Sequence, residues 1–527
     1  MAERITLDEL KTYLWGSAVL LRTHIDAGAY KQYIFPLLFF KRICDVYDEE
    51  RAASFAEYGE DFPENHRFDV PDGYHWRDVR SVAENVGVAI VDAFRAIERA
   101  NIEKLQGVFG DGAWTNKQRL TDELLKDLIE HFSTLTLSIA NCPEDELGQG
   151  YEYLIRKFAD DSGHTAQEFY TNRTVVHLMT EILKPQSGES IYDPTCGSAG
   201  MLISAIAYLK AQNKEWRNVR IYGQEINALT SAIARMNLFL HGVKDFEIVN
   251  DDTLTSPAFI DNGKLRTFDI VVANPPYSIK QWNQAAFAAD KYGRNFLGTP
   301  PQGRADYAFF QHILKSLDPK TGRCAILFPH GVLFRAEENA LREKLIRSDL
   351  VECVIGLGPN LFFNSPMEAC IVICRTSKAP DRRGKVLLIN ALSEVTRKSA
   401  QSWLEDGHIR KIARAFDNYD DIEGFATVIT IADAEKNNFS LSIPLYVKEV
   451  VAEETKDTRS FSECLDAWKE RCFDAHTAYE ELASLLGGEI GGPQNIVKEG
   501  GPGVGSVAEK FSSTARDDKD GGTGDES

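Results

Sequence analysis

The sequence is poor in features that would place a protein in a membrane or outside the cell. Its 527 residues contain no apolar run of about 18 residues, the length that a transmembrane helix needs. The first residues, MAERITLDELKTYLW, lack a basic stretch followed by an apolar core, so no secretory signal is expected. The nine cysteines stand singly, without a CxxC pair or a Cys/His cluster. We therefore predict a cytoplasmic protein with reduced thiols, without disulfides and without a zinc or other metal site.

Positive charge is also scarce. The chain has 59 Lys and Arg against 79 Asp and Glu, which gives a net charge of −20. This balance argues against a protein that grips nucleic acid alone through a large basic surface. A local basic groove, or a partner that supplies positive charge, stays possible. The GxGxxG and GxxxxGK[ST] motifs are missing, which disfavours a dinucleotide cofactor and an ATP motor.

The length predicts two or three domains, because one ordinary core does not accommodate 527 residues. Residues 1–145 have apolar positions at helical spacing, so we expect an all-α N-terminal domain that packs or docks. From 146 to 450 apolar strands alternate with helices, which is typical of a doubly wound, mostly parallel sheet. The predicted fold class is therefore α/β. A C-terminal helical segment over 451–487 and a disordered tail over 488–527 are expected to follow.

Eight strands are predicted in the second part. They are 190–194, 219–225, 246–250, 268–274, 323–329, 350–358, 368–375 and 385–391. The connection between the sixth and the seventh is too short for a crossover helix, so an antiparallel return is expected there. Residues 393–450 show mixed patterns and give no strand prediction.

Polar residues follow three successive strands at their carboxyl ends. The stretch DPTCGSAG, which begins at Asp193, is a glycine-containing loop that opens an apolar helix, and such helix starts accept carboxylates or phosphates. Glu225 ends the next strand and suits a ribose diol. A carboxylate of NDDTL, over 250–254, suits the amine of an adenine ring. Each alone also fits a tight turn or a solvated loop carboxylate, but together on one sheet edge they indicate a ligand site.

The strand over 268–274 ends abruptly at Asn274-Pro275-Pro276-Tyr277. Two prolines cannot continue a strand, because neither donates to a ladder. An aromatic amine is a poor nucleophile, and an amide oxygen plus a rigid backbone carbonyl can accept both of its protons and favour a pyramidal nitrogen. Tyr277 supplies a stacking face, and a base in a duplex must be flipped out to reach it. A plain Pro-Pro turn is the alternative.

In this order, DPTCGSAG, GQE, NDDTL and NPPY resemble the motifs of S-adenosylmethionine-dependent amino-methyltransferases that act on DNA. QEFYTNRTVV, over 167–176, is similar to the further motif that these enzymes place before the cofactor loop. YKQYIFPLLFFKRICD, LGQGYEYLIRKFAD, PPQGRADYAFFQHIL and NNFSLSIPLYV extend the match to the modification (M) subunit of type I restriction–modification systems, over roughly residues 5–450. The resemblance implies a Rossmann-like methyltransferase sheet and methyl transfer from S-adenosylmethionine to adenine N6 in DNA.

The resemblance also implies the site residues. The base contacts are Asn274, Pro275, Pro276 and Tyr277. The cofactor contacts are Gln167, Glu168, Phe169, Tyr170, Thr171, Asn172, Cys196, Gly197, Ser198 and Glu225, supported by Asp193 and Asp252. Two positions depart from the family pattern, since Asn172 stands where proline is usual and Cys196 where a small residue is common. No Pro-Cys dipeptide exists, so the nucleophilic cysteine of cytosine-C5 methyltransferases is missing.

The partners implied are a DNA-specificity (S) subunit, a second copy of the M subunit, a restriction (R) subunit and double-stranded DNA with a flipped adenine. The N-terminal helices and a helix over 460–486 are candidate docking surfaces, with simple packing as the alternative for the latter. NPPY also suits guanine N2 of RNA, cytosine N4 or a protein glutamine. A non-catalytic module that only holds the cofactor or a partner is the remaining alternative.

The polar stretch 278–306 after NPPY is long and carries glycine and proline, so we expect a mobile loop that closes over the flipped base. Its cations are Lys280, Lys291, Arg294 and Arg304. They are expected either to contact phosphates or to be solvated loop charges.

Overall fold

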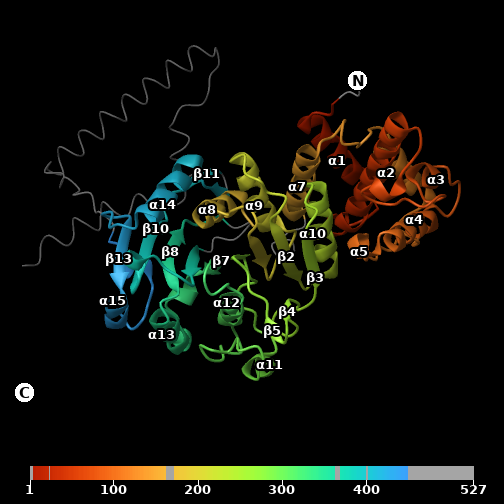
Figure 1. Cartoon of the computed structure of the whole chain (residues 1–527). Helices are drawn as coiled ribbons and strands as arrows, with labels where there is room; N and C mark the ends of the chain where they lie inside the picture. Colours follow the sequence, from red (N-terminus) through yellow and green to blue (C-terminus); the bar gives the residue numbers. More distant parts are fainter. Residues whose placement is uncertain (1–3, 23, 162–170, 362–367, 399–400, 449–527) are drawn as a thin grey trace, which may run out of the picture. The chain divides into compact units, whose positions relative to one another are not determined.

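The computed structural model describes residues 4–22, 24–161, 171–361, 368–398 and 401–448 (Figure 1). All of them belong to one compact unit, Met1–Val450. The predicted helix over 460–486, the predicted tail over 488–527 and the motif residues 167–170 lie outside the described residues. No helix among those described is both long and apolar enough to cross a bilayer.

The first part of the chain is helical, as predicted. Its helices are α1 (Leu7–Leu21), α2 (Lys31–Tyr58), α3 (Trp76–Arg80), α4 (Val86–Ala100), α5 (Ile102–Leu105) and α6 (Asp122–Ser133). Thr6 caps α1 through a reciprocal capping box with Glu9. α2 is the central element, because its Phe35, Leu38 and Phe40 are almost fully buried. The apolar core of these helices extends onto α10 (Ala228–Leu240) of the second part, so the predicted division at residue 145 stays a prediction.

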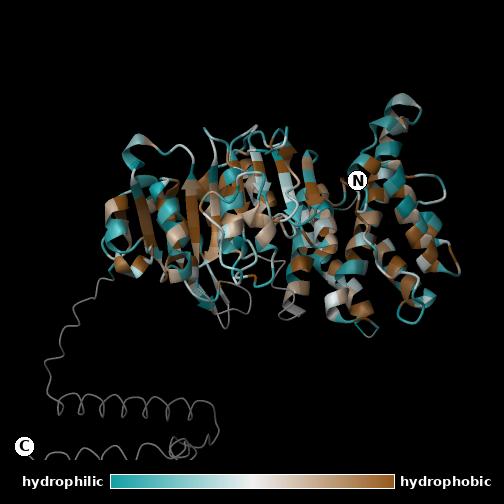
Figure 2. Ribbon diagram, turned by 90° about the horizontal axis from the view of Figure 1, so that it is seen from below, coloured by the Kyte–Doolittle hydropathy of each residue, from teal (hydrophilic) through white to brown (hydrophobic). Residues whose placement is uncertain are grey.

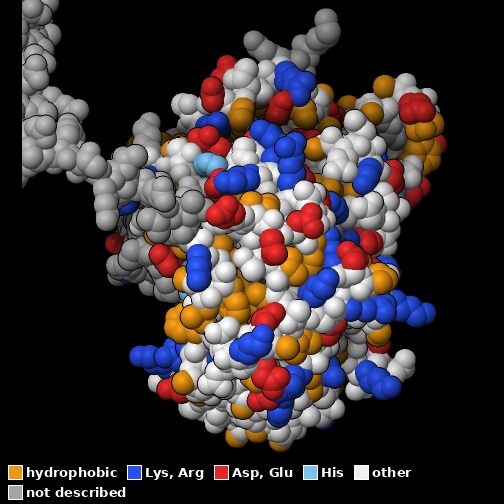
Figure 3. All heavy atoms as spheres, turned by 90° about the vertical axis from the view of Figure 1, so that its left-hand side faces the viewer, with side chains coloured by type: hydrophobic (Ala, Val, Ile, Leu, Met, Phe, Trp, Pro, Cys, Tyr) orange, Lys and Arg blue, Asp and Glu red, His pale blue; other side chains and the backbone are white. Residues whose placement is uncertain are grey.

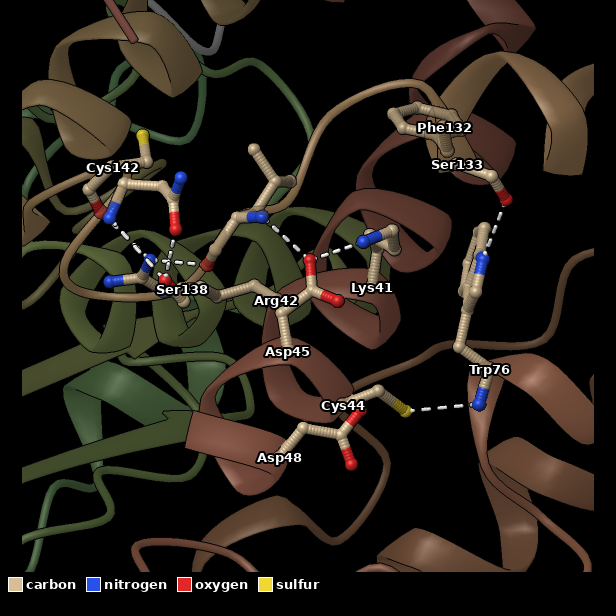
Figure 4. A network of polar contacts seen from close by, with 12 residues as sticks. Lys41, Arg42, Cys44, Asp45, Asp48, Trp76, Phe132, Ser133, Ser138 and Cys142 are labelled. Atoms are coloured by element: carbon tan, nitrogen blue, oxygen red, sulfur yellow. Dashed lines mark hydrogen bonds and ion pairs between the residues drawn. The ribbon is translucent and has the colours of Figure 1, made fainter. Parts of the chain in front are cut away.

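The segment 137–142, which leads from α6 towards α7 (Glu144–Asp161), is held along α2 by charged side chains (Figure 4). Arg42 donates to the carbonyl oxygens of Leu137 and, at 2.8 Å, of Cys142. Asp45 pairs with Lys41 and accepts from the Leu137 amide at 2.6 Å. Glu49 accepts from two further amides of the segment, at 2.7 and 2.9 Å. The connection between the two parts is therefore fixed at many points.

A nine-stranded sheet forms the second part. Its order is β13 (Ala426–Thr430), β10 (Lys385–Ala391), β8 (Val351–Leu357), β9 (Ala369–Arg375), β7 (Arg323–Pro329), β6 (Ile270–Ala273), β1 (Ser190–Asp193), β2 (Arg220–Glu225) and β3 (Phe246–Asn250). Only β9 and β13 run against the others. The eight predicted strands are confirmed, and so is the antiparallel return from β8 to β9. β13 was not predicted, because its five residues lie in the mixed stretch and only its pairing with β10 reveals it.

Helices cover both faces of this sheet (Figures 1 and 2). The longer ones are α8 (Arg173–Leu183), α9 (Gly200–Ala211), α10, α12 (Asp306–Lys315), α13 (Asn339–Arg347) and α14 (Asp406–Asn418). The shorter elements are α11 (Gln284–Ala288), α15 (Ile431–Lys436), β4 (Ile260–Asp261), β5 (Lys264–Leu265), β11 (Thr396–Lys398) and β12 (Gln401–Trp403). Neighbouring strand residues alternate between two cores: Ile191 packs with α8, α9 and α14, and Tyr192 packs with α12 and α13. The doubly wound, mostly parallel α/β fold is thus confirmed.

Candidate active site

The loop between β1 and α9 turns tightly at the first predicted strand tip. Gly197 and Ala199 both have left-handed backbone angles, with φ of 54° and 65°. The Cys196 amide donates to the carbonyl oxygen of Gln224 at 3.0 Å, which holds the loop against β2. A Cβ atom on Gly223 would lie 3.0 Å from the Cys196 sulfur, so β2 needs glycine beside this loop.

Glu225, at the end of β2, is bound to the same loop. Its carboxylate accepts from the Gly197 amide at 3.1 Å and from the Asn227 amide at 2.8 Å. The next residue, Ile226, is 69% exposed although it is a large aliphatic side chain. The sequence reasoning missed Ile226, whose only signal is an apolar residue directly after the polar tip. An apolar surface is therefore exposed directly beside the Glu225 carboxylate.

The third tip, after β3, is held by hydrogen bonds within itself and by one to the loop between β1 and α9. Asp252 accepts from the Leu254 amide at 3.0 Å and from the Thr255 hydroxyl at 2.8 Å. The Thr253 hydroxyl donates to the carbonyl oxygen of Pro194 at 2.5 Å. The three polar tips that sequence reasoning grouped on one edge are thus joined by hydrogen bonds.

Asp193 gives this edge its electrostatic character. The side chain is 2% exposed and accepts from the Thr195 amide at 2.9 Å. Burial raises its pKa to about 8, and the nearby Glu225 carboxylate adds to the increase. A cation bound here would favour the ionised form of Asp193 and would itself be stabilised. The two acceptor carboxylates of Asp193 and Glu225 therefore suit a ligand that carries positive charge and hydroxyl groups.

Asn274 stands at the end of β6 with its side-chain amide oriented by one contact. Nδ2 donates to the hydroxyl of Thr171 at 3.1 Å. Oδ1 is buried and accepts no hydrogen bond from any described residue. Buried amide oxygens are almost always bonded, so this oxygen indicates a missing donor. Pro275 beside it is buried, and burial raises the pKa of the half-buried Tyr277 phenol well above its usual value.

The chain after Tyr277 is anchored by a buried ion pair. Ser278 has a backbone angle φ of 52°, which residues other than glycine rarely adopt. Its amide donates to Asp306 Oδ1 at 2.9 Å, and Asp306 Oδ2 accepts from Arg335 Nη1 at 2.7 Å. Glu338 Oε2 lies 3.6 Å from the same nitrogen, and burial raises the pKa of Glu338 to about 7. Asp306 and Glu338 are both almost fully buried. This anchor was not predicted, since nothing in the local sequence links positions 278, 306 and 335.

Arg294 corrects an expectation for the loop over 278–306. It is 2% exposed, pairs with the buried Asp290 at 2.7 Å and donates to the carbonyl oxygens of Thr253 and Leu254, both at 2.9 Å. A side chain so enclosed cannot reach a phosphate, so that expectation is wrong for Arg294. Instead it ties the loop to the third strand tip. For Lys280, Lys291 and Arg304 a phosphate contact stays a prediction.

Asn172 has a structural role at the start of α8. Its Oδ1 accepts from the Thr174 amide at 3.0 Å, and its Nδ2 donates to the carbonyl oxygens of Leu361 and Ser402 at 3.0 and 3.1 Å. The backbone carbonyl of Asn172 also accepts from the Val175 and Val176 amides, both at 3.1 Å, so its side chain and its carbonyl are both engaged by the protein. Ser198 is buried in the loop below, where its carbonyl oxygen accepts from Asn237 at 2.9 Å.

Comparison with known proteins identifies the family. Residues 143–456 match the family described as N-6 DNA Methylase, and residues 10–132 match the HsdM N-terminal domain. The chain belongs to the N-6 DNA methylase family. This N-6 DNA methylase is similar to the type I restriction enzyme MjaVIII methylase subunit of Methanocaldococcus jannaschii, with 30% identity over 94% of this chain and 86% of that one. It is 34% identical to the type I restriction enzyme HindI methylase subunit of Haemophilus influenzae, over 72% of this chain and 86% of that one.

A solved structure agrees with these relatives. The methyltransferase subunit of a type I restriction–modification system from Streptococcus thermophilus superposes with a TM-score of 0.74 and 29% identity, over 84% of this chain and 100% of that one. The predicted class is thereby confirmed: this N-6 DNA methylase is an M subunit, an enzyme that uses S-adenosylmethionine to methylate adenine N6 in DNA. Which residues perform each part is a separate question.

Proposed function

We propose that Asn274 Oδ1 and the backbone carbonyl of Pro275 accept the two amine protons of a flipped adenine, while Tyr277 stacks on its ring. One observation carries this assignment. The Asn274 amide is oriented by Thr171 so that its buried oxygen faces no donor among the described residues. A buried acceptor without a donor is costly, and the adenine amine is the donor that would satisfy it.

The residues of the neighbouring tips fit S-adenosylmethionine. Glu225 would accept from the ribose hydroxyls, and the exposed Ile226 would cover one face of the adenine ring. The Gly197 amide is already bound to Glu225, so the start of α9 would face the cofactor carboxylate, and buried Asp193 would respond to the positive charge. Thr171 would contact the cofactor through the face that Asn274 does not use. The residues 167–170 complete the predicted set outside the described residues.

The bound cofactor supplies a methyl group on a sulfonium, which is already an activated donor. The task of the chain is therefore to position the acceptor nitrogen and to keep water away. Asn274 and the Pro275 carbonyl would hold the amine with its lone pair towards the methyl group, and this contact strengthens as the nitrogen becomes pyramidal. The Asp306–Arg335 pair holds the backbone after Tyr277, so the base platform is set before DNA arrives.

The proposed assembly contains a DNA-specificity subunit, a second M subunit and a restriction subunit in the cytoplasm. The net charge of −20 supports a division of labour in which the S subunit supplies most of the DNA affinity. Figure 3 shows the face beyond β13, on which Lys and Arg side chains are mixed with Asp and Glu side chains around hydrophobic ones. We propose residues 1–145 as the docking part, 146–450 as the methyltransferase and 451–487 as a helical docking segment, followed by a tail.

Mass spectrometry of DNA nucleosides tests the function. The chain is incubated with S-adenosylmethionine and unmethylated DNA of its source genome, with and without the neighbouring candidate S subunit. N6-methyladenine that appears only with the S subunit is expected. Asn274→Ala should abolish it, whereas Asn437→Ala, on a different element, should not. Methylation by the chain alone would contradict the division of labour, and no methylated base at all would contradict the proposed acceptor.

A further inference from the structure

One exposed aromatic ring stands at the carboxyl end of β7. Phe334 is 52% exposed and follows the short 3-10 helix η4 (His330–Leu333). β7 lies parallel to β6, with Ile326 level with Ala273. Both strands therefore end at the same sheet edge, so the turn that carries Phe334 emerges where Asn274 and Tyr277 do. Sequence reasoning assigned this ring no role.

The backbone holds Phe334 rigidly. The two preceding residues, Val332 and Leu333, are 2% and 3% exposed. The Val332 carbonyl accepts from the Tyr307 hydroxyl at 3.1 Å, and the Leu333 carbonyl accepts from the Leu441 amide at 2.9 Å. Single exposed apolar side chains are common on protein surfaces, so exposure alone does not indicate a binding site. A ring presented outward by a buried, bonded turn is pre-organised for contact with a ligand.

The next residue connects Phe334 to the base site. Arg335 Nη2 donates to the hydroxyl of Ser278 at 3.4 Å, and Ser278 directly follows Tyr277. Arg304 reaches the same hydroxyl at 3.5 Å. Its side chain is 37% exposed and lies 3.7 Å from the exposed Glu337. Thus the residue after Phe334 and the partly exposed Arg304 both contact Ser278, at the rim of the proposed base site.

We propose that Phe334 stacks on a nucleobase of the DNA next to the flipped adenine, with Arg304 on a neighbouring phosphate. This inference rests on the proposed function of the site. Flipping one nucleotide exposes the faces of its neighbours, and an aromatic ring can cover such a face whatever the base. The partly exposed Arg304 guanidinium, within reach of Ser278, would attract the backbone of the displaced nucleotide. The pair thereby keeps the duplex open while Asn274 holds the adenine.

The test uses the purified complex of the chain with its S subunit. A labelled duplex, selected from the source genome by binding to the wild-type complex, is titrated by fluorescence anisotropy. We compare Phe334→Ala, Phe334→Tyr and the control Leu445→Ala, since Leu445 is also exposed, at 51%, and lies outside the proposed docking part. Phe334→Ala is expected to weaken binding about tenfold, Phe334→Tyr to bind like the wild type, and Leu445→Ala to leave binding unchanged.

Two outcomes would overturn the proposal. One is a Phe334→Ala complex that binds the duplex as tightly as the Leu445→Ala complex. The other is a Phe334→Ala chain that no longer co-purifies with the S subunit, because the ring would then be a protein contact. Binding is read without turnover, so the result does not depend on methyl transfer. If the proposed function failed, the wild-type complex would form no N6-methyladenine, whatever the effect of Phe334.

Discussion

Asn274, which directly follows β6, and Thr171, 103 residues earlier in the chain, are joined by a hydrogen bond of 3.1 Å from Nδ2 to the threonine hydroxyl. The contact links the motif that precedes the cofactor loop to the residue proposed to hold the adenine. Among the described residues, the amide nitrogen of Asn274 is engaged and its oxygen accepts no hydrogen bond. The orientation proposed for holding the adenine is therefore present in the chain alone.

Replacing Thr171 by valine should lower the turnover number about tenfold, because the Asn274 amide would lose the acceptor that orients it. Thr171→Ser keeps the hydroxyl and should stay close to the wild type. Single-turnover methylation by the complex with the S subunit measures both variants. A serine variant that loses activity while the valine variant keeps it would show that the methyl group of Thr171, and not its hydroxyl, is what matters.

Asp306→Asn should separate catalysis from cofactor binding. The asparagine oxygen can still accept from the Ser278 amide, but the charge that pairs with Arg335 is lost. We expect the turnover number to fall at least about tenfold, because a small displacement of the base platform is costly. The dissociation constant for S-adenosylmethionine, measured by calorimetry, should change little. A large change in cofactor affinity with normal turnover would contradict this role.

Arg294→Met should destabilise the protein by about 3–5 kcal/mol, because it leaves the buried Asp290 carboxylate without its partner. The Thr253 and Leu254 carbonyl groups would also lose their donor, so the affinity for S-adenosylmethionine should fall. Chemical unfolding and calorimetry measure the two effects. The control is Lys291→Met, which removes an exposed cation of the same loop and should change neither quantity. An Arg294→Met chain as stable as this control would refute the buried pair.

Glu338 should make the protein less stable as the pH rises. Its pKa is raised from 4.5 to about 7 by burial, so between these values the unfolded chain loses the proton while the folded chain keeps it. The ionised carboxylate therefore costs the folded state up to about 3 kcal/mol, reached above pH 7.

Glu338→Gln carries no such penalty. Its thermal midpoint, compared with that of the wild type, should rise progressively from pH 5 to pH 8. The neighbouring Glu337 is exposed, and Glu337→Gln should show no such trend. Parallel curves for the wild type and Glu338→Gln would mean that the carboxylate is ionised at no cost.

Local patterns predicted the strands and their polar tips well, because the apolar character of a buried strand and the change to polar residues at its end both appear in consecutive residues. The order of the tips indicated a methyltransferase site for the same reason. β13 escaped prediction because its five residues become a strand through pairing with β10. The Ser278–Asp306–Arg335 anchor escaped it too, since its three residues meet only in the folded chain.

Arg294 shows a second limit of prediction from the sequence. A cation in a polar, glycine-bearing stretch predicts a solvated charge or a phosphate contact, and its sequence neighbours give no sign of burial. Only the packing of Asp290 and of two distant carbonyl groups around it reveals the opposite. The composition of a loop indicates the average environment of its residues and not the environment of each single residue.

The segment 137–142, bonded along α2 by Arg42, Asp45 and Glu49, has a mechanical consequence. A peptide that is tied at both backbone donors and acceptors does not serve as a hinge. Under the proposed docking on residues 1–145, forces applied to the helical part would reach the sheet without a flexible joint at this segment. Opening and closing around a duplex would then arise from rotation of whole subunits relative to each other, with each M chain moving as one rigid body.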